Sequence, residues 1–322
     1  MVLVSAVGSE SRFAAYVEGL ASVIGHKDRI SPLRDYCTGL MLPCERKSVE
    51  PMAAVTAPTR TAAQHQSLLH FVGEGGWSDE RVMAKVREMV LPAIARQGPI
   101  EAWIIDDTGF PKQGRHSVGV ARQYCGQLGK QDNCQVAVSL SIANHHASLP
   151  VAYRLYLPKD WAGDSKRRRK TRVPEDVCFK TKPEITLEQI DAACKAGLPR
   201  GVVLMDAGYG CNTELRAGID ALSLRYVAGI MPQTTVWASG TGPLPPKKWS
   251  AAGDRQSSFA GMTSISRSRS RTLLLACRRA LGARSSGGRE RPSRCPRALR
   301  GRAFVLRIVI TISLTAGRKN GC

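Results

Sequence analysis

The spacing of apolar residues predicts a helical N-terminal region over residues 1–98. Three segments have apolar residues at helical intervals, namely 9–25, 29–42 and 60–72. Ser78, followed by Asp79 and Glu80, is typical of a helix start, because its hydroxyl can cap a free amide and carboxylates favour the positive end of the helix dipole. We expect this fourth helix to run to about Gln97. Such a region can bind DNA or pack on a neighbouring domain, and the pattern favours packing.

From residue 99 the pattern changes to short apolar or alternating runs, which predict strands. The expected strands are Ile100–Asp107, Ser117–Gln123, Gln135–Ala143, Leu149–Leu157, Val202–Asp206 and Arg225–Ile230. Between them we expect a loop and two helices, Thr186–Ala196 and Thr213–Ala221. Early strands in series, followed by alternating strands and helices, predict an α/β fold with a mixed sheet flanked by helices over residues 99–250.

The composition points to a polyanionic partner. The chain has 322 residues and a net charge of +21, which favours DNA or RNA over a membrane surface, since no apolar run is long enough to span a bilayer. The N-terminus lacks the basic start of a signal peptide. Ten cysteines without a Cys-x-x-Cys pair argue against a zinc ribbon and favour reduced thiols in the cytoplasm.

Residues 251–322 differ from the rest of the chain. They hold 16 Lys/Arg against two acids, with Arg outnumbering Lys fifteen to one, and they include Ser/Arg and Gly/Pro-rich stretches. We expect a largely disordered basic tail. Translation in a shifted reading frame of GC-rich DNA would produce the same break in composition, so both origins stay open.

Two apolar strands each end in a carboxylate that is followed by a glycine turn. The first runs into Asp106-Asp107-Thr108-Gly109, and the second into Asp206-Ala207-Gly208-Tyr209. Sites in α/β folds form at the carboxyl ends of strands, and hard divalent cations prefer oxygen ligands. In a basic protein, such a pair indicates metal-assisted chemistry on a nucleic-acid backbone.

Residues 106–130 and 203–210 resemble the DDE-type transposases of bacterial insertion sequences, a group described as DDE superfamily endonucleases, and the resemblance extends over roughly residues 10–250. It implies a ribonuclease-H-like core that binds Mg²⁺ (or Mn²⁺) and cleaves and transfers DNA strands at element ends, and synapsis in this family implies at least a homodimer. It also implies that Asp107 and Asp206 are the first two metal ligands. Asp107 is preferred to Asp106 because the family's first acid directly precedes threonine.

The residues themselves leave simpler roles open for two of these acids. Side chains alternate along a strand, so Asp106 should face away from Asp107 and could form a cap or an ion pair. Asp206 could be only an N-cap. The family's third acid, a Glu on a helix, should follow residue 250, where the tail offers only Glu290 between Gly and Pro. The third acid is therefore unknown, and we expect impaired activity in a frameshifted remnant.

Clustered cations are the candidate DNA contacts. Six of them lie in one run of seven residues, which could contact phosphates or form a solvated loop: Lys166, Arg167, Arg168, Arg169, Lys170 and Arg172. Lys112, Arg115 and Arg122 follow the first acid and could lie near the scissile bond, although Arg122 could equally pair with a carboxylate. Trp161 is expected to anchor a loop, with stacking on a base as the alternative.

Two alternatives remain besides a transposase. One is a DNA-binding remnant without catalysis, which would show steep salt dependence and no cleavage. The other is an unrelated metal-dependent nuclease or phosphatase, which would not need specific element ends. The sequence has no Gly-x-x-x-x-Gly-Lys loop and no nucleophile elbow, which argues against ATP-driven chemistry and serine hydrolysis.

Overall fold

The computed structural model describes residues 3–231, 234–236 and 268–269. The chain divides into two compact units: Met1–Glu101 with Ser141–Ala152, and Ala102–Leu140 with Tyr153–Cys322. The first unit therefore consists of two separate segments of the chain, because it includes Ser141–Ala152 from within the strand-forming region. The predicted boundary between residues 98 and 99 separates helices from strands along the chain but does not describe this interleaving.

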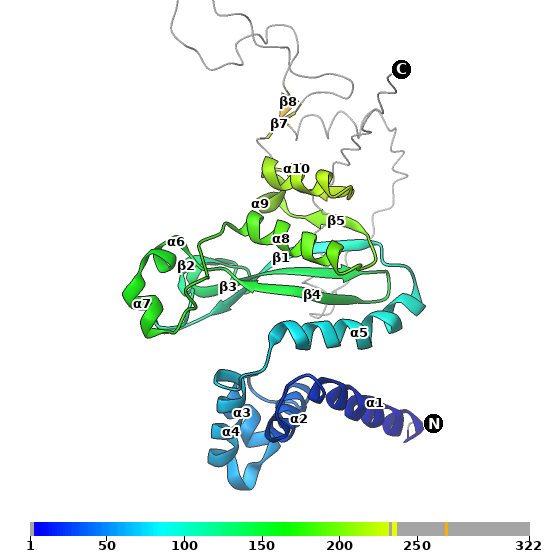
Figure 1. Cartoon of the computed structure of the whole chain (residues 1–322), viewed down its shortest axis with the longest axis vertical. Coiled ribbons are helices and arrows are strands. Elements are labelled where there is room, and N and C mark those ends of the chain that lie inside the picture. Colours follow the sequence, from blue (N-terminus) through cyan, green and yellow to red (C-terminus); the bar gives the residue numbers. More distant parts are fainter. Residues whose placement is uncertain (1–2, 232–233, 237–267, 270–322) are drawn as a thin grey trace, which may run out of the picture. The chain divides into compact units, whose positions relative to one another are not determined.

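The N-terminal segment of the first unit is helical, and its second segment carries the end of one strand and the start of the next. Its helices are α1 (Leu3–Ala21), η1 (Lys27–Arg29), α2 (Ile30–Met41), α3 (Val49–Thr56), η2 (Pro58–Arg60), α4 (Thr61–Gly73) and α5 (Asp79–Gln97) (Figure 1). Their buried side chains form two clusters, which are Val17, Leu20, Ile24, Leu33 and Phe71, and Met52, Ala53 and Leu68. The prediction for α5 is confirmed, since Ser78 Oγ accepts from Arg81 N at 3.2 Å. Helix α3 was not predicted, because Pro51 resembles a break although proline is tolerated in a first turn.

A six-stranded mixed sheet confirms the predicted α/β fold. Its strands are β1 (Ala102–Pro111), β2 (Ala121–Cys125), β3 (Lys130–Ala143), β4 (Ser148–Leu155), β5 (Val202–Met205) and β6 (Tyr226–Ala228). The order is β2-β3-β1-β5-β6, with β4 also paired to β3. Strands β1, β5 and β6 are parallel, whereas β2 and β3 are antiparallel. The two central parallel strands, β1 and β5, are those predicted to end in carboxylates.

The remaining described elements of the second unit are helices α6 (Lys159–Gly163), α7 (Ser165–Lys170), α8 (Lys182–Lys195), α9 (Ala207–Gly210) and α10 (Thr213–Ala221), and a pair of two-residue strands, β7 (Thr235–Val236) and β8 (Ser268–Arg269). Helix α8 lies against the sheet (Figure 1), where Gln189 Nε2 donates to Val138 O at 3.1 Å. Helices α6, α7 and α9 were not predicted, because they are too short for a periodic pattern. Apart from β8, the predicted basic tail lies outside the described residues.

Helix α8 begins four residues before its predicted start. A capping box explains the difference: Thr181 Oγ1 accepts from the Glu184 amide, and the Glu184 carboxylate accepts from the Thr181 amide. The earlier start brings Lys182 into the first turn. No helix in the described part of the chain is both long and apolar enough to cross a membrane.

Candidate active site

Three carboxylates lie where β5 ends beside the middle of β1, which continues past the expected strand end at Asp107 to Pro111. Parallel pairing aligns Ala102 with Val202 and Ile104 with Leu204, so the two strands reach Asp106-Asp107 and Asp206 at the same edge of the sheet. We call Asp106, Asp107 and Asp206 the acidic edge. The first strand of the pair is buried up to this point, with Trp103 and Ile105 inside, and becomes accessible where the carboxylates begin.

Asp206 caps helix α9 and is held by a close glycine contact. Its Oδ1 accepts from Gly208 N at 2.9 Å and Tyr209 N at 3.1 Å. A Cβ at Gly210 would lie 2.2 Å from Gly229 O, so only glycine lets this turn approach the end of β6. Asp206 Oδ2 has no hydrogen-bond partner among the described residues. The N-cap role considered for Asp206 is therefore present, and it leaves one carboxylate oxygen available.

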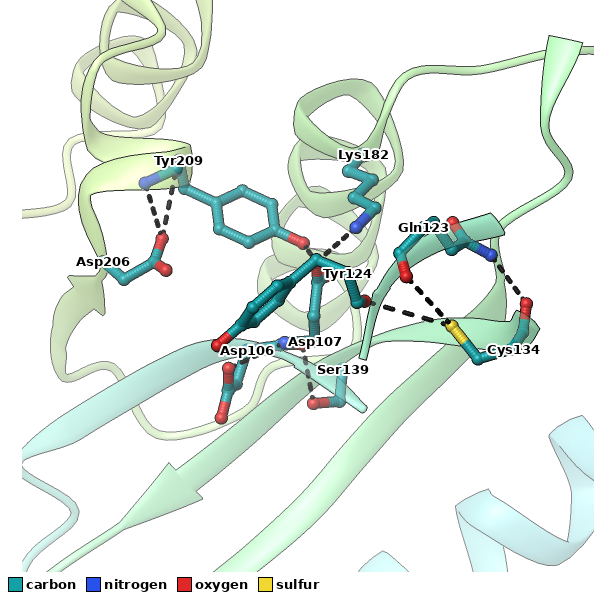
Figure 2. A network of polar contacts seen from close by, with 10 residues as sticks. Asp106, Asp107, Gln123, Tyr124, Cys134, Ser139, Lys182, Asp206 and Tyr209 are labelled. Carbon is teal, nitrogen blue, oxygen red and sulfur yellow. Dashed lines mark hydrogen bonds and ion pairs between the residues drawn. The ribbon is translucent and has the colours of Figure 1, made fainter. Parts of the chain in front are cut away.

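Asp107 has both carboxylate oxygens occupied by side chains from distant elements. Lys182 Nζ at the start of α8 pairs with Oδ2, and Tyr209 OH in α9 donates to Oδ1 (Figure 2). Burial first, and then the adjacent Asp107 charge and hydrogen bond, raise the pKa of Tyr209, so the phenol stays protonated and remains a donor. Sequence reasoning missed both residues. Lys182 carries no local signal, whereas Tyr209 lies in the same turn motif as Asp206.

Asp106 projects away from this pair, as the alternation along a strand predicts (Figure 2). Its Oδ1 accepts from Asp107 N at 2.8 Å, which is a local cap, and it forms no ion pair within the described residues. Ser139 Oγ on β3 donates to its backbone carbonyl at 3.1 Å. Burial raises the pKa of the Asp106 carboxyl, the hydrogen bond from the Asp107 amide lowers it, and the charges of Asp107 and Asp206 add to the increase. The three carboxylates are thus close enough to repel one another.

The acidic edge fits a divalent cation in part. Its donors are carboxylate oxygens, the ligands that Mg²⁺ and Mn²⁺ prefer. Asp106 and Asp206 each retain an unpartnered oxygen, whereas Asp107 would have to exchange Lys182 for the ion. Within residues 3–231, no three His, Cys, Asp or Glu side chains converge as a ready metal site. Any third ligand from beyond residue 250, Glu290 included, lies outside the described residues.

The basic run adopts helix α7 and divides into two sets of cations. Arg167 lies over the Trp161 ring at 3.5 Å and donates to Arg115 O at 2.6 Å. Arg168 donates to several backbone carbonyls of the following turn, among them Pro174 O and Val177 O, each at 2.8 Å. These two guanidinium groups therefore hold the segment together. The exposed cations of the run are Lys166, Arg169, Lys170 and Arg172.

The structure brings the two predicted basic segments together. Arg167 bonds to Arg115, and Asn133 Nδ2 holds the intervening loop through Lys112 O at 2.6 Å. Lys112, Arg115 and Arg122 are exposed, and Arg122 forms no ion pair within the described residues. We call the exposed cations the basic lobe: Lys112, Arg115, Arg122, Lys166, Arg169, Lys170 and Arg172. Lys112 lies just past the end of β1 and five residues after Asp107, which is about 17 Å along an extended chain.

Trp161 anchors its segment, as predicted, and does not present a stacking surface. Its side chain is 1% exposed, its Nε1 donates to Val120 O at 2.7 Å, and the Arg167 guanidinium covers its ring. The alternative of stacking on a base is therefore wrong for this residue.

Two central parallel strands of a mixed sheet thus bring Asp107 and Asp206 to the same edge. The chain belongs to the DDE superfamily endonucleases, whose family profile matches residues 19–278. The predicted resemblance is thereby confirmed, and the match continues beyond the expected boundary at residue 250. Enzymes of this superfamily generally depend on divalent metal ions.

A relative gives a more particular comparison. The chain is 29% identical over 195 residues to a protein of Microchaete diplosiphon described as a probable transposase for insertion sequence element IS701. The matched region covers 60% of this chain and 46% of that protein, so the chain corresponds to less than half of the relative's length.

Proposed function

We propose that this chain derives from the transposase of an insertion sequence, with a metal-dependent site for DNA strand cleavage and transfer at Asp107 and Asp206. The observation that carries the proposal is the acidic edge, where the carboxylates of β1 and the one that follows β5 meet on two neighbouring parallel strands. Support also comes from the family match and from the transposase-like relative. The partners would be the ends of the element and target DNA, and synapsis would require a homodimer.

The residues of the acidic edge have separable roles in this proposal. Asp107 and Asp206 would hold Mg²⁺ or Mn²⁺, which supplies activation of the attacking oxygen and stabilisation of the leaving oxygen. Tyr209 orients Asp107 by hydrogen bonding to Oδ1. Lys182 neutralises the same carboxylate and would compete with an ion for it. The Gly210–Gly229 contact fixes the turn that carries Asp206.

The basic lobe would bind the DNA backbone. Its cations are exposed, and four of them lie on a segment that Trp161, Arg167 and Arg168 hold in place, so that segment loses little conformational freedom on binding. Of the nine predicted DNA contacts, we now assign Arg167 and Arg168 to positioning this segment. The other seven remain proposed phosphate contacts, which would set affinity without reading sequence.

The second candidate is a DNA-binding remnant that does not cleave. It is favoured because no three His, Cys, Asp or Glu side chains among the described residues form a metal site. The expected Glu would follow residue 250, and a change of reading frame would remove it. Because the family match continues to residue 278, we place such a change toward that residue rather than at 250. Reading the gene in all three frames tests this point, and an intact restored protein that lacks activity would contradict it.

Nicking and binding assays on the full chain separate the two candidates. We would incubate supercoiled plasmid with the protein and Mn²⁺, and measure duplex binding against salt for the same samples. Asp107→Asn and Asp206→Asn should abolish nicking and retain binding. Asp160→Asn, an exposed acid on α6, is the matched control and should nick like the parent chain.

Each outcome has a definite meaning. Nicking that needs both aspartates supports the transposase site. Salt-dependent binding without nicking supports the non-catalytic remnant. Nicking that survives Asp107→Asn and Asp206→Asn would refute the assignment of the site.

A further inference from the structure

Three large apolar side chains are exposed on adjacent parts of β1, β2 and the turn after β2. Phe110 is 45% exposed, Tyr124 62% and Leu128 43%. We call them the apolar tip. Exposed apolar side chains are common singly, but a group of them beside a proposed active site calls for a binding partner.

The backbone brings the apolar tip next to the strand that carries the acidic edge. A Cβ at Gly109 would lie 3.0 Å from Cys125 Sγ and 3.1 Å from its Cα, so β1 and β2 touch at this point. Cys125 is fully buried there. Phe110 directly follows Gly109 in the sequence, and Tyr124 directly precedes Cys125; both are exposed. In Figure 2 the Tyr124 ring extends toward the part of the site where Asp106 and Asp107 lie.

Backbone hydrogen bonds hold the turn of the tip. The amides of Leu128 and Gly129 both donate to Cys125 O, at 3.0 and 2.9 Å, and Gly129 adopts the left-handed conformation with φ 66°. Tyr124 pairs with Gln131 in the β2–β3 ladder. Tyr124 and Leu128 are therefore presented by a closed hairpin, which reduces the entropy lost when a ligand binds them.

The surrounding charge identifies the chemistry of the partner. Lys112 lies two residues after Phe110, Arg122 lies two residues before Tyr124, and Lys130 follows the turn, all of them exposed. Protein-binding surfaces are depleted of charge at their centres. Aromatic rings interleaved with exposed cations match unpaired nucleic acid, in which bases stack on rings and phosphates contact cations.

We propose that Tyr124, supported by Phe110 and Leu128, stacks on an unpaired nucleobase next to the phosphate held at the acidic edge. This inference rests on the proposed DNA function and adds to it a contact with bases rather than with the backbone. Trp161 cannot take this role because its ring is buried and covered. The contact would favour DNA whose strands are already separated at the cleavage point.

The test compares two single-stranded probes of equal charge, oligothymidylate and an abasic strand, both about 15 nucleotides long. We expect the full chain to bind oligothymidylate about tenfold more tightly, since stacking on one base is worth on the order of 1.4 kcal/mol. Tyr124→Ala should abolish this preference, and Tyr124→Phe should keep it. Tyr153→Ala on β4 is the matched control, because Tyr153 is 51% exposed, and it should also keep the preference.

A direct readout accompanies the affinities. A 2-aminopurine placed in the oligothymidylate should be quenched by the parent chain and by Tyr124→Phe, but not by Tyr124→Ala. Equal, salt-dependent binding of both probes by the parent chain would overturn the stacking contact and leave the proposed DNA function standing. A preference that persists in Tyr124→Ala would also overturn it. Failure of the parent chain to bind either probe at low salt would refute both proposals.

Discussion

Replacing Lys182 by methionine should increase the affinity of the acidic edge for a divalent cation. Lys182 Nζ pairs with Asp107 Oδ2, the oxygen that an ion would need. Methionine keeps most of the length and the apolar stem of lysine but removes its charge. The substitution therefore removes a competitor for the carboxylate while leaving Tyr209 on the other oxygen.

The size of the effect follows from the exposure of the pair. The side chains of Lys182 and Asp107 are 28% and 32% exposed. Opposite unit charges near a protein surface attract by about 4 kcal/mol at 4 Å, but solvation and side-chain entropy leave about 1 kcal/mol for such a pair. An ion that must displace Lys182 loses that amount. We therefore expect Lys182→Met to bind Mn²⁺ about fivefold more tightly.

Calorimetric titration of the metal-free full chain with Mn²⁺ measures this difference. Lys180→Met is the matched control. It removes the same charge two residues away, and Lys180 pairs with Glu188 rather than with Asp107. Its affinity for Mn²⁺ should stay close to that of the parent chain. If Lys182→Met binds Mn²⁺ no more tightly than Lys180→Met, the competition between lysine and ion is refuted.

Three further predictions concern the basic segment, its anchor Trp161 and the Glu188 carboxylate on α8. Trp161→Phe should lower the free energy of unfolding by about 1–2 kcal/mol, because it removes the indole donor and leaves the buried Val120 carbonyl unpaired; an unchanged urea midpoint would contradict this. Arg172 has a positive φ of 55°, so Arg172→Gly should stabilise the chain by about 0.5–1 kcal/mol. The same change should reduce the salt dependence of duplex binding by about one phosphate contact, and an unchanged slope would exclude Arg172 from the DNA-binding surface. Hydrogen bonding from Lys180, with a smaller contribution from Arg154, holds the pKa of Glu188 below its ordinary value. Its charge therefore stabilises the fold above the unfolded-state pKa, and this contribution is lost as pH falls through the folded pKa. The difference in unfolding free energy between the parent chain and Glu188→Gln, below about 1 kcal/mol for so exposed a pair, should shrink below about pH 4; a difference that grows with acid would contradict the assignment.

The local chemistry of the site could be predicted because it lies in short stretches of chain. The apolar runs before Asp107 and Asp206 predict buried strands, and a carboxylate at the end of each predicts a functional edge. The cap at Ser78 is equally local and is confirmed. Each of these patterns has a period or a motif that a few neighbouring residues specify.

The partners of those residues could not be predicted in this way. Lys182 meets Asp107 across 75 positions of sequence, because helix α8 returns over the sheet and its capping box places Lys182 in the first turn. Tyr209 reaches the same carboxylate from beyond β5. Neither contact leaves a periodic trace in the chain, since both depend on which strands become neighbours.

The basic run shows the same division between local and tertiary information. Sequence alone established six cations in seven residues and therefore a strongly positive segment. Only the tertiary structure decided that Arg167 and Arg168 bind the protein's own ring and carbonyls while the other four cations face solvent. Charge is a property of composition, whereas its availability depends on which carbonyls and aromatic rings the fold brings within reach.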